Sequence, residues 1–179
     1  MDIYKHKLTQ LQEEIFSLLC LHAGEKMSQR EISGKLKVSP TAISNSLGLL
    51  EQEKLIKIEK LKTINFVSLN RDEEKTISLK RVENIKNIYS SKILDYLENE
   101  LPGGTIILFG SYSRGEDTNT SDIDFAIIGR KDKSLILGKF EEILNKKVNI
   151  NFYESWKKIE EHLKNNILNG IVFSGGVEL

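Results

Sequence analysis

The stretch from Phe109 to Ile128 constrains the fold of this chain more than any other, because two short apolar runs flank a polar turn within it. It reads FGSYSRGEDTNTSDIDFAII. Asp122 and Asp124 stand at the head of the second run, and alternate side chains of a strand share a face, so both carboxylates point the same way. Such a pair is repulsive unless a cation lies between the two acids, and carboxylate oxygens favour magnesium or manganese. The spacing therefore predicts a divalent-metal site.

The first apolar run predicts a buried strand that ends in a phosphate-binding turn. Residues 105–109 read TIILF, and Gly110 and Ser111 follow before a segment that can start a short helix. Backbone N–H groups at such a start can donate to phosphate oxygens, while Ser111 adds a hydroxyl and Arg114 a planar guanidinium. We expect these groups to hold the phosphates of a nucleoside triphosphate beside the metal.

The combined pattern resembles the polymerase-β-like nucleotidyltransferase superfamily, in particular its minimal branch, whose signature is GSxxRG followed by SDxD. The positions that match this signature are Gly110, Ser111, Arg114, Gly115, Ser121, Asp122 and Asp124. The resemblance covers the chain from about Ile85 onward and implies transfer of a nucleotidyl group from a triphosphate to a hydroxyl acceptor. It also implies Mg²⁺ or Mn²⁺ as cofactor. By the resemblance, the nucleotide is bound by Gly110, Ser111, Arg114 and Ser121, and the metal by Asp122 and Asp124.

One position departs from the family pattern. The family usually carries a third carboxylate on a later strand, where it completes the metal site and helps to deprotonate the acceptor hydroxyl. Residues 147–152 read KVNINF, and their alternation directs Asn149 toward the acids. An amide carries no charge and accepts no proton at neutral pH. Two readings stay open: an enzyme with Asn149 in its catalytic set, or a nucleotide-binding domain with little or no turnover. Glu116 and Glu154 are candidate substitutes for the third carboxylate, but neither has the family's position, and a solvated surface position is favoured for both.

The N-terminal third has the element order of a winged helix-turn-helix. Apolar residues recur at helical spacing until Gly24 ends a first helix. Ser28 and Glu31 then form a capping box for a second helix, and Pro40 opens a third. Two strands follow at residues 55–60 and 64–69, around a short basic turn. The phrase SQREISGKLKVSPTAISNSLGLLEQEKLIKIEK is similar to the DNA-reading part of the winged-helix family.

Under that resemblance the helix from Pro40 enters the major groove of DNA, and the hairpin after it is the wing. The residues directed toward bases or phosphates are Thr41, Ser44, Asn45, Lys57, Lys60 and Lys62. The recognition helix has no Arg or Lys before Lys54, so the affinity of one module is modest and a homodimer is favoured. The alternative is a winged helix that serves only protein interaction or dimerisation.

The remaining elements follow from breaks in the pattern. Residues 70–101 contain neither Gly nor Pro, which predicts one long helix or two abutting helices. Further helices are predicted over 134–144 and 155–168. The predicted domains are a winged helix over 1–70, a helical linker over 71–101 and a minimal nucleotidyltransferase domain over 102–179, whose first helix starts at about residue 85. The fold class is α/β (α+β), with a mixed sheet in the second domain.

Composition narrows the classes of function. The chain has 26 basic and 26 acidic side chains, which argues against wholesale polyanion binding and against a membrane surface. Residues 1–70 hold 10 basic and 8 acidic side chains, a net of +2. Cys20 is the only cysteine, so a disulfide framework and a thiolate metal site are excluded. No apolar stretch reaches membrane-spanning length, and we expect a cytoplasmic protein.

The preferred hypothesis is a DNA-binding winged-helix protein that carries a nucleotidyltransferase domain, binds a magnesium–triphosphate complex and acts on a protein or nucleic-acid hydroxyl. The alternative is a transcriptional regulator that senses a nucleotide without consuming it. The family adds a third option, because many minimal nucleotidyltransferases act as partners of small helical toxin proteins.

Overall fold

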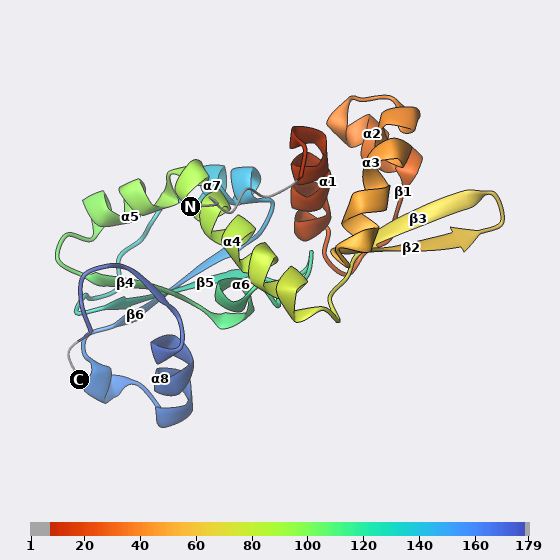
Figure 1. The fold of residues 1–179 in the computed structure, drawn as a ribbon. Helices are drawn as coiled ribbons and strands as arrows, with labels where there is room; N and C mark the ends of the chain where they lie inside the picture. The colour runs from red at the N-terminus through yellow and green to blue at the C-terminus, as the bar shows by residue number, and fades with distance from the viewer. Residues whose placement is uncertain (1–7, 178–179) are drawn as a thin grey trace, which may run out of the picture. The chain divides into compact units, whose positions relative to one another are not determined.

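The computed structural model describes residues 8–177 of the chain (Figure 1). The chain divides into two compact units, Met1–Thr76 and Ile77–Leu179, which are described separately below. The finer division predicted from the sequence, with boundaries after residues 70 and 101, stays a prediction. Among the described residues, none of the helices has the length and apolar character that crossing a bilayer requires.

The described part of unit 1 contains three helices and a small antiparallel sheet. The elements are α1 (Gln10–Leu21), β1 (Met27–Ser28), α2 (Gln29–Leu36), α3 (Pro40–Gln52), β2 (Ile56–Leu61) and β3 (Ile64–Leu69). The strands lie in the order β1-β3-β2. This is the winged helix-turn-helix predicted from the sequence, with β2 and β3 as the wing. The short strand β1 was not predicted, and it pairs through Met27 with Val67 of β3.

Side-chain caps fix where the helices of unit 1 begin. Ser28 and Glu31 form the predicted capping box at α2, and Ser39 accepts a hydrogen bond from the backbone of Ala42 with Pro40 at the first turn of α3. The inward faces of the helices then meet the sheet in a core that excludes water. Its members with at most 2% exposure include Ile15, Leu19, Ile32, Ile43, Leu47, Leu50 and Val67.

Unit 2 is built on a mixed four-stranded sheet. Its elements are α4 (Glu74–Ser91, which starts just before the unit boundary), α5 (Ile93–Glu100), β4 (Thr105–Phe109), α6 (Gly110–Arg114), β5 (Ile123–Ile128), α7 (Gly138–Leu144), β6 (Val148–Tyr153), the 3-10 helix η1 (Trp156–Lys158), α8 (Glu161–Leu168) and β7 (Ile171–Ser174). The strand order is β6-β5-β4-β7. β5 and β6 are parallel, whereas β4 is antiparallel to both β5 and β7. The mixed sheet confirms the predicted fold class.

Both faces of this sheet are covered, which explains the continuous apolar runs of β4 and β5. Alternate residues of the strands, such as Leu108 and Phe125, face a core that is closed by α5 and α7. Leu97 of α5 and Phe140 of α7 belong to this core. The residues that alternate with these along β4 and β5 face a second core, which is closed by η1 and α8 and contains Trp156. Figure 1 shows α5 and α7 on one side of β4 and β5, and α8 on the other.

The helices confirm one prediction and differ from two others. The segment 70–101 forms two abutting helices, one of the two predicted arrangements, because Lys92 adopts a left-handed conformation with φ of 64° between α4 and α5. The helix predicted over 134–144 begins only at Gly138, since the backbone N–H of Ile136 donates to the hydroxyl of Tyr96 at 2.9 Å. The helix predicted over 155–168 is split, because the buried Ile159 is extended and separates η1 from α8.

Candidate functional site

The predicted acid pair lies at one end of the sheet, where three strands meet. Asp124 is opposite Phe109 of β4 on one side and opposite Asn149 of β6 on the other. Asp122 immediately precedes β5. The amide nitrogen of Asn149 donates to Asp124 Oδ1 at 3.0 Å and to Asp122 Oδ2 at 3.2 Å. One amide thus bridges both carboxylates.

This bridge has an electrostatic consequence. A carboxylate at position 149 would add a third negative charge to the group, whereas the two N–H bonds of Asn149 stabilise the paired acids. The bridge leaves the remaining carboxylate oxygens of Asp122 and Asp124 for other partners.

The donor set fits a hard divalent cation. Magnesium in nucleotide sites is commonly bound by one or two carboxylates together with substrate phosphates and water, and the acid pair supplies those carboxylates. Over residues 8–177 no cluster of three or more His, Cys, Asp or Glu side chains forms a metal site by itself. A cation held by Asp122 and Asp124 would therefore depend on ligands from the nucleotide.

The glycine turn approaches the acids closely. Gly110 has φ of 77°, a left-handed conformation that favours glycine, and a Cβ atom there would lie 2.9 Å from Asp124 Oδ2. Only glycine lets the backbone pass the carboxylate at this distance. Gly115 ends α6 with φ of 78°, and a Cβ atom there would lie 2.4 Å from the carbonyl oxygen of Ile77.

The other predicted nucleotide-binding side chains are engaged to different degrees. Ser111 is half-buried on α6, directly after Gly110. Arg114 donates through Nε to Glu116 Oε2 at 2.7 Å and through a terminal nitrogen to Asn166 Oδ1 at 3.2 Å. Ser121 Oγ accepts from the backbone N–H of Thr118 at 2.9 Å and so belongs to the turn before the acids.

The acids considered as substitutes for the third carboxylate have other partners. Glu116 holds Arg114, and Glu154 pairs with Lys158 one helical turn away. Both are exposed, as expected from the sequence. Sequence reasoning missed two features next to the site: the contact of Asn166 with Arg114, and a buried ionic group around Asp117 that is described below. Both join residues at least 25 positions apart, and no local pattern encodes them.

The predicted DNA-facing residues lie on the outer surface of unit 1. Thr41, Ser44 and Asn45 are exposed on α3, opposite its buried face. Lys60 and Lys62 are exposed near the tip of the wing. Lys57 is different. Its ammonium donates to Asp72, and this bond lowers the pKa of that carboxyl.

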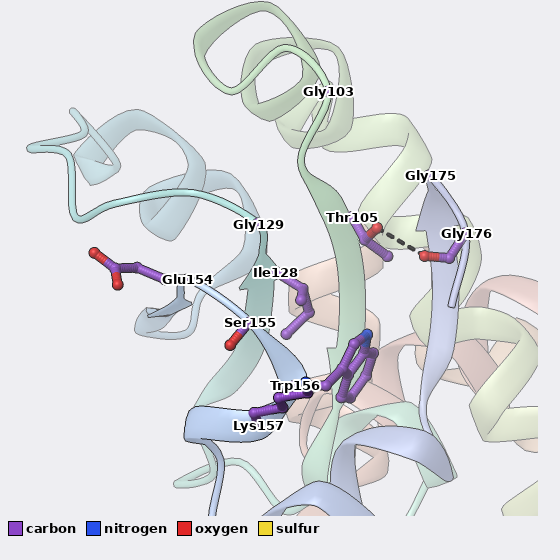
Figure 2. A pocket seen from close by; sticks show the side chains of 10 residues that line it. All are labelled: Gly103, Thr105, Ile128, Gly129, Glu154, Ser155, Trp156, Lys157, Gly175 and Gly176. Atoms are coloured by element: carbon purple, nitrogen blue, oxygen red, sulfur yellow. Dashed lines mark hydrogen bonds between the residues drawn. The ribbon is translucent and has the colours of Figure 1, made fainter. Parts of the chain in front are cut away.

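A hollow lies at the end of the sheet opposite the acid pair. It has a volume of about 580 Å³, and Figure 2 shows Thr105, Ile128 and Trp156 on its walls. Its remaining lining residues are Gly103, Gly129, Glu154, Ser155, Lys157, Gly175 and Gly176. Thr105 pairs with Ile128, four residue pairs along the ladder from Phe109 and Asp124, a distance of roughly 13 Å. The hollow is therefore separate from the acid pair.

Comparison with known proteins gives two kinds of match. The sequence model of the nucleotidyltransferase-domain family matches residues 90–174, which include the acid pair, the glycine turn and Asn149. Over 67 residues the chain is 36% identical to the protein named "Putative protein adenylyltransferase MJ0604" from Methanocaldococcus jannaschii, and this match covers 28% of this chain and 67% of that protein.

A comparison with solved structures gives matches to part of the chain. Lactococcus lactis ZitR, a zinc-responsive MarR family member, is similar with a TM-score of 0.41 and 24% identity over 56% of this chain and 68% of that one. Wild-type ZitR in complex with DNA gives a TM-score of 0.41 and 25% identity over 56% of this chain and 67% of that one. The chain thus spans about two thirds of the length of these proteins.

The residues of the acid pair, the glycine turn and the strand of Asn149 all fall inside the family match. The curated relative is 36% identical, and the match extends over 67% of its length. The chain therefore belongs to the nucleotidyltransferase-domain family, and it carries that domain together with a winged-helix unit.

Proposed function

We propose that the nucleotidyltransferase domain binds a nucleoside triphosphate with Mg²⁺ or Mn²⁺ and transfers a nucleotidyl group to a protein or nucleic-acid hydroxyl. The winged helix binds DNA. The observation that carries the proposal is the bridging of Asp122 and Asp124 by Asn149, directly beside the turn at Gly110. This geometry brings carboxylate oxygens and a glycine turn to one end of the sheet, which supports metal binding by the acids and phosphate binding by the turn.

Each residue has a role in this proposal. Asp122 and Asp124 hold the metal, which when bound neutralises phosphate charge and aligns the triphosphate. Gly110 and Ser111 approach the phosphates through backbone N–H groups and a hydroxyl, and Arg114 adds a positive charge. Ser121 orders the turn that leads into the acids.

The acceptor hydroxyl must lose a proton as it attacks the α-phosphorus, and the bond from that phosphorus to the bridging oxygen of pyrophosphate breaks. Asn149 takes no proton at neutral pH, unlike the carboxylate usual at its position. The proton therefore passes to solvent water as pyrophosphate leaves, and proton removal is the slow step of the reaction in this chain. Substrate placement and charge neutralisation supply most of the rate.

Asn149 also favours a second candidate function. With Asn149 in place of a base, the domain can bind a triphosphate and leave it intact, so that the nucleotide acts as a signal to the winged helix. The protein is then a transcriptional regulator that senses a nucleotide. This function predicts binding of both ligands with a measurable coupling free energy.

The enzyme claim is tested by incubating the wild-type protein with each nucleotide labelled at the α-phosphate, Mg²⁺ or Mn²⁺, and cell extract. Transfer of label to protein or nucleic acid, lost in Asp124→Asn, supports the enzyme. If no label is transferred from any nucleotide, the enzyme claim is wrong. The matched control is Asp132→Asn, because Asp132 is exposed in the loop after β5.

The sensor is tested by titrating unhydrolysable triphosphate with and without Mg²⁺ and then measuring DNA affinity in both states. A shift in DNA affinity caused by the nucleotide supports the sensor, and equal affinities count against it.

Purification of the protein from its own cells tests the remaining proposals. A small co-purifying helical chain indicates a toxin-like partner. The molecular mass of the purified protein in solution shows whether it is a homodimer. We place the protein in the cytoplasm, and fractionation of the same cells checks this location.

A further inference from the structure

A buried ionic cluster lies inside unit 2, behind the turn that leads into the acid pair. We call it the Asp117 cluster; it consists of Lys80, Asn84, Asp117 and Lys146. Lys80 and Asp117 are 0% exposed, Asn84 is 3% exposed and Lys146 is 8% exposed. Four polar side chains at this depth are costly to bury, so their contacts must offset a large desolvation penalty.

Asp117 is the centre of the cluster. Its Oδ1 accepts from Lys80 Nζ and, at 2.7 Å, from the amide nitrogen of Asn84. Its Oδ2 lies 3.4 Å from Lys146 Nζ and accepts no hydrogen bond from the described residues. The ammonium groups of Lys80 and Lys146 thus share the carboxylate of Asp117.

Lys146 also contacts the turn before the acids. Its ammonium donates to the backbone carbonyl of Thr118 and, at 3.2 Å, to the carbonyl of Ser121. Ser121 directly precedes Asp122. Lys146 therefore fixes both ends of the turn from Thr118 to Ser121, and through it the position of Asp122.

The cluster also reaches the other segments of the site. Asn84 donates at 2.9 Å to the carbonyl of Tyr112, which lies on α6 between Ser111 and Arg114. The ammonium nitrogens of Lys80 and Lys146 lie 5.9 Å and 6.0 Å from the centre of the Tyr112 ring. Lys146 itself stands three residues before Asn149 along the chain. The three segments that carry the candidate site residues are thus tied to one buried point.

We propose that Lys146 and Asp117 are positioning residues of the nucleotidyltransferase site, which set the distance between Asp122 and the other metal-binding oxygens. This inference rests on the proposed function, because it assigns the two residues an effect on metal-nucleotide binding. A cluster that only stabilises the fold would lower the melting temperature and leave the affinity of the folded protein unchanged. Ligand-orienting partners outside the metal-binding groups change metal affinity by about 10-fold to 100-fold when they are removed.

The test measures binding of Mn²⁺ in the presence of triphosphate, by electron paramagnetic resonance of the free ion, on full-length protein well below its melting temperature. Lys146→Met removes the ammonium and keeps the length of the side chain, and we expect affinity to fall about 10-fold or more. Lys146→Arg keeps the charge and should restore most of the affinity. Lys147→Met is the matched control, because Lys147 is the exposed neighbour, and its affinity should equal that of the wild type.

Hydrogen exchange gives a second readout that needs no ligand. In Lys146→Met the amides of Ser121 and Ile123 should exchange faster, while amides in the centre of β4 keep their wild-type rates. If Lys146→Met does not fold, Asp117→Asn, which keeps the shape of the side chain, is measured in the same way. Wild-type affinity in a folded Lys146→Met or Asp117→Asn protein overturns the positioning role alone. Failure of the wild type to bind Mn²⁺ with triphosphate overturns the proposed function, and the positioning role with it.

Discussion

Asn149 donates its side-chain amide to Asp124 at 3.0 Å across the parallel pair β5 and β6, at the point where the family usually carries a carboxylate. The same nitrogen reaches Asp122 at 3.2 Å. The acid pair is therefore held together by a neutral donor. This contact lets the two carboxylates converge, and an amide at position 149 accepts no proton at neutral pH.

Asn149→Asp should restore the third carboxylate. Without metal the variant should be less stable by about 0.5 to 1.5 kcal/mol, because two solvent-exposed hydrogen bonds to carboxylates are lost and like charges converge. Mn²⁺ should raise its melting temperature more than that of the wild type, and label transfer should increase. Thermal unfolding with and without Mn²⁺ measures the first effect. Asn165→Asp, on the exposed side of α8, is the control; an equal Mn²⁺ response in both variants would argue against a metal site at residue 149.

Gly110→Ala should lower both the free energy of unfolding and the affinity for triphosphate. The new Cβ would lie 2.9 Å from Asp124 Oδ2, and alanine is strained at φ of 77°, which together should cost about 1 to 3 kcal/mol. Urea unfolding measures the loss, and triphosphate binding should fall with it. Gly138→Ala is a matched control, because that glycine opens α7 and a methyl group there would meet no other part of the chain within 4 Å. If both variants are equally stable, the close approach at Gly110 is not a constraint.

The sequence predicted the placement of Asn149 beside the acid pair better than it predicted the neighbouring helices. The period of two in residues 147–152 put Asn149 on the same face as Asp124, and the strand pairing has this arrangement. Strand alternation is local, so it can be read from neighbouring residues. The break at Ile159 and the late start of α7 depend on contacts with distant parts of the chain, such as the bond from Ile136 to Tyr96. Local propensity does not contain these contacts.

The Asp117 cluster shows the same limit of local sequence patterns. Lys80 and Lys146 look like ordinary surface lysines in a sequence with 26 basic side chains. Their burial arises because one carboxylate, 37 positions from Lys80 and 29 from Lys146, collects both ammonium groups. Pairing over this separation is a property of the fold.

Glu116→Gln should strengthen triphosphate binding. The carboxylate of Glu116 lies 2.7 Å from Arg114 Nε and competes with phosphate for the guanidinium. Exposed ion pairs contribute about 0 to 1 kcal/mol, so the gain in affinity should be up to about fivefold. Isothermal titration at low and high salt measures it. Glu142→Gln, on the exposed face of α7, should leave affinity unchanged; a loss of affinity in Glu116→Gln would mean that the carboxylate takes part in binding.

Low pH should destabilise the N-terminal turn of α2. Hydrogen bonds from Ser28 lower the pKa of Glu31 below its ordinary value of 4.5. A carboxyl with a lowered folded pKa adds stability above its unfolded pKa, and that stability is lost as the pH falls from about 4.5 through the folded pKa. Glu31→Gln should therefore flatten the decline of melting temperature below pH 4.5. Glu51→Gln, exposed on α3, should follow the wild-type curve. Parallel curves for all three proteins would remove Glu31 as a source of acid sensitivity.

The wing lysines should differ in their contribution to DNA binding. Lys60 and Lys62 are exposed near the tip of the hairpin, whereas Lys57 donates to Asp72 and must break this bond to reach a phosphate. Lys60→Ala and Lys62→Ala should each weaken binding across all sequences and reduce the slope of log affinity against log salt by about 1. Lys57→Ala should change the slope less. Fluorescence anisotropy with one duplex over a salt series measures the slopes. Equal slopes for all three variants would show that the ion pair with Asp72 does not restrain Lys57, and unchanged slopes throughout would remove the wing from the DNA interface.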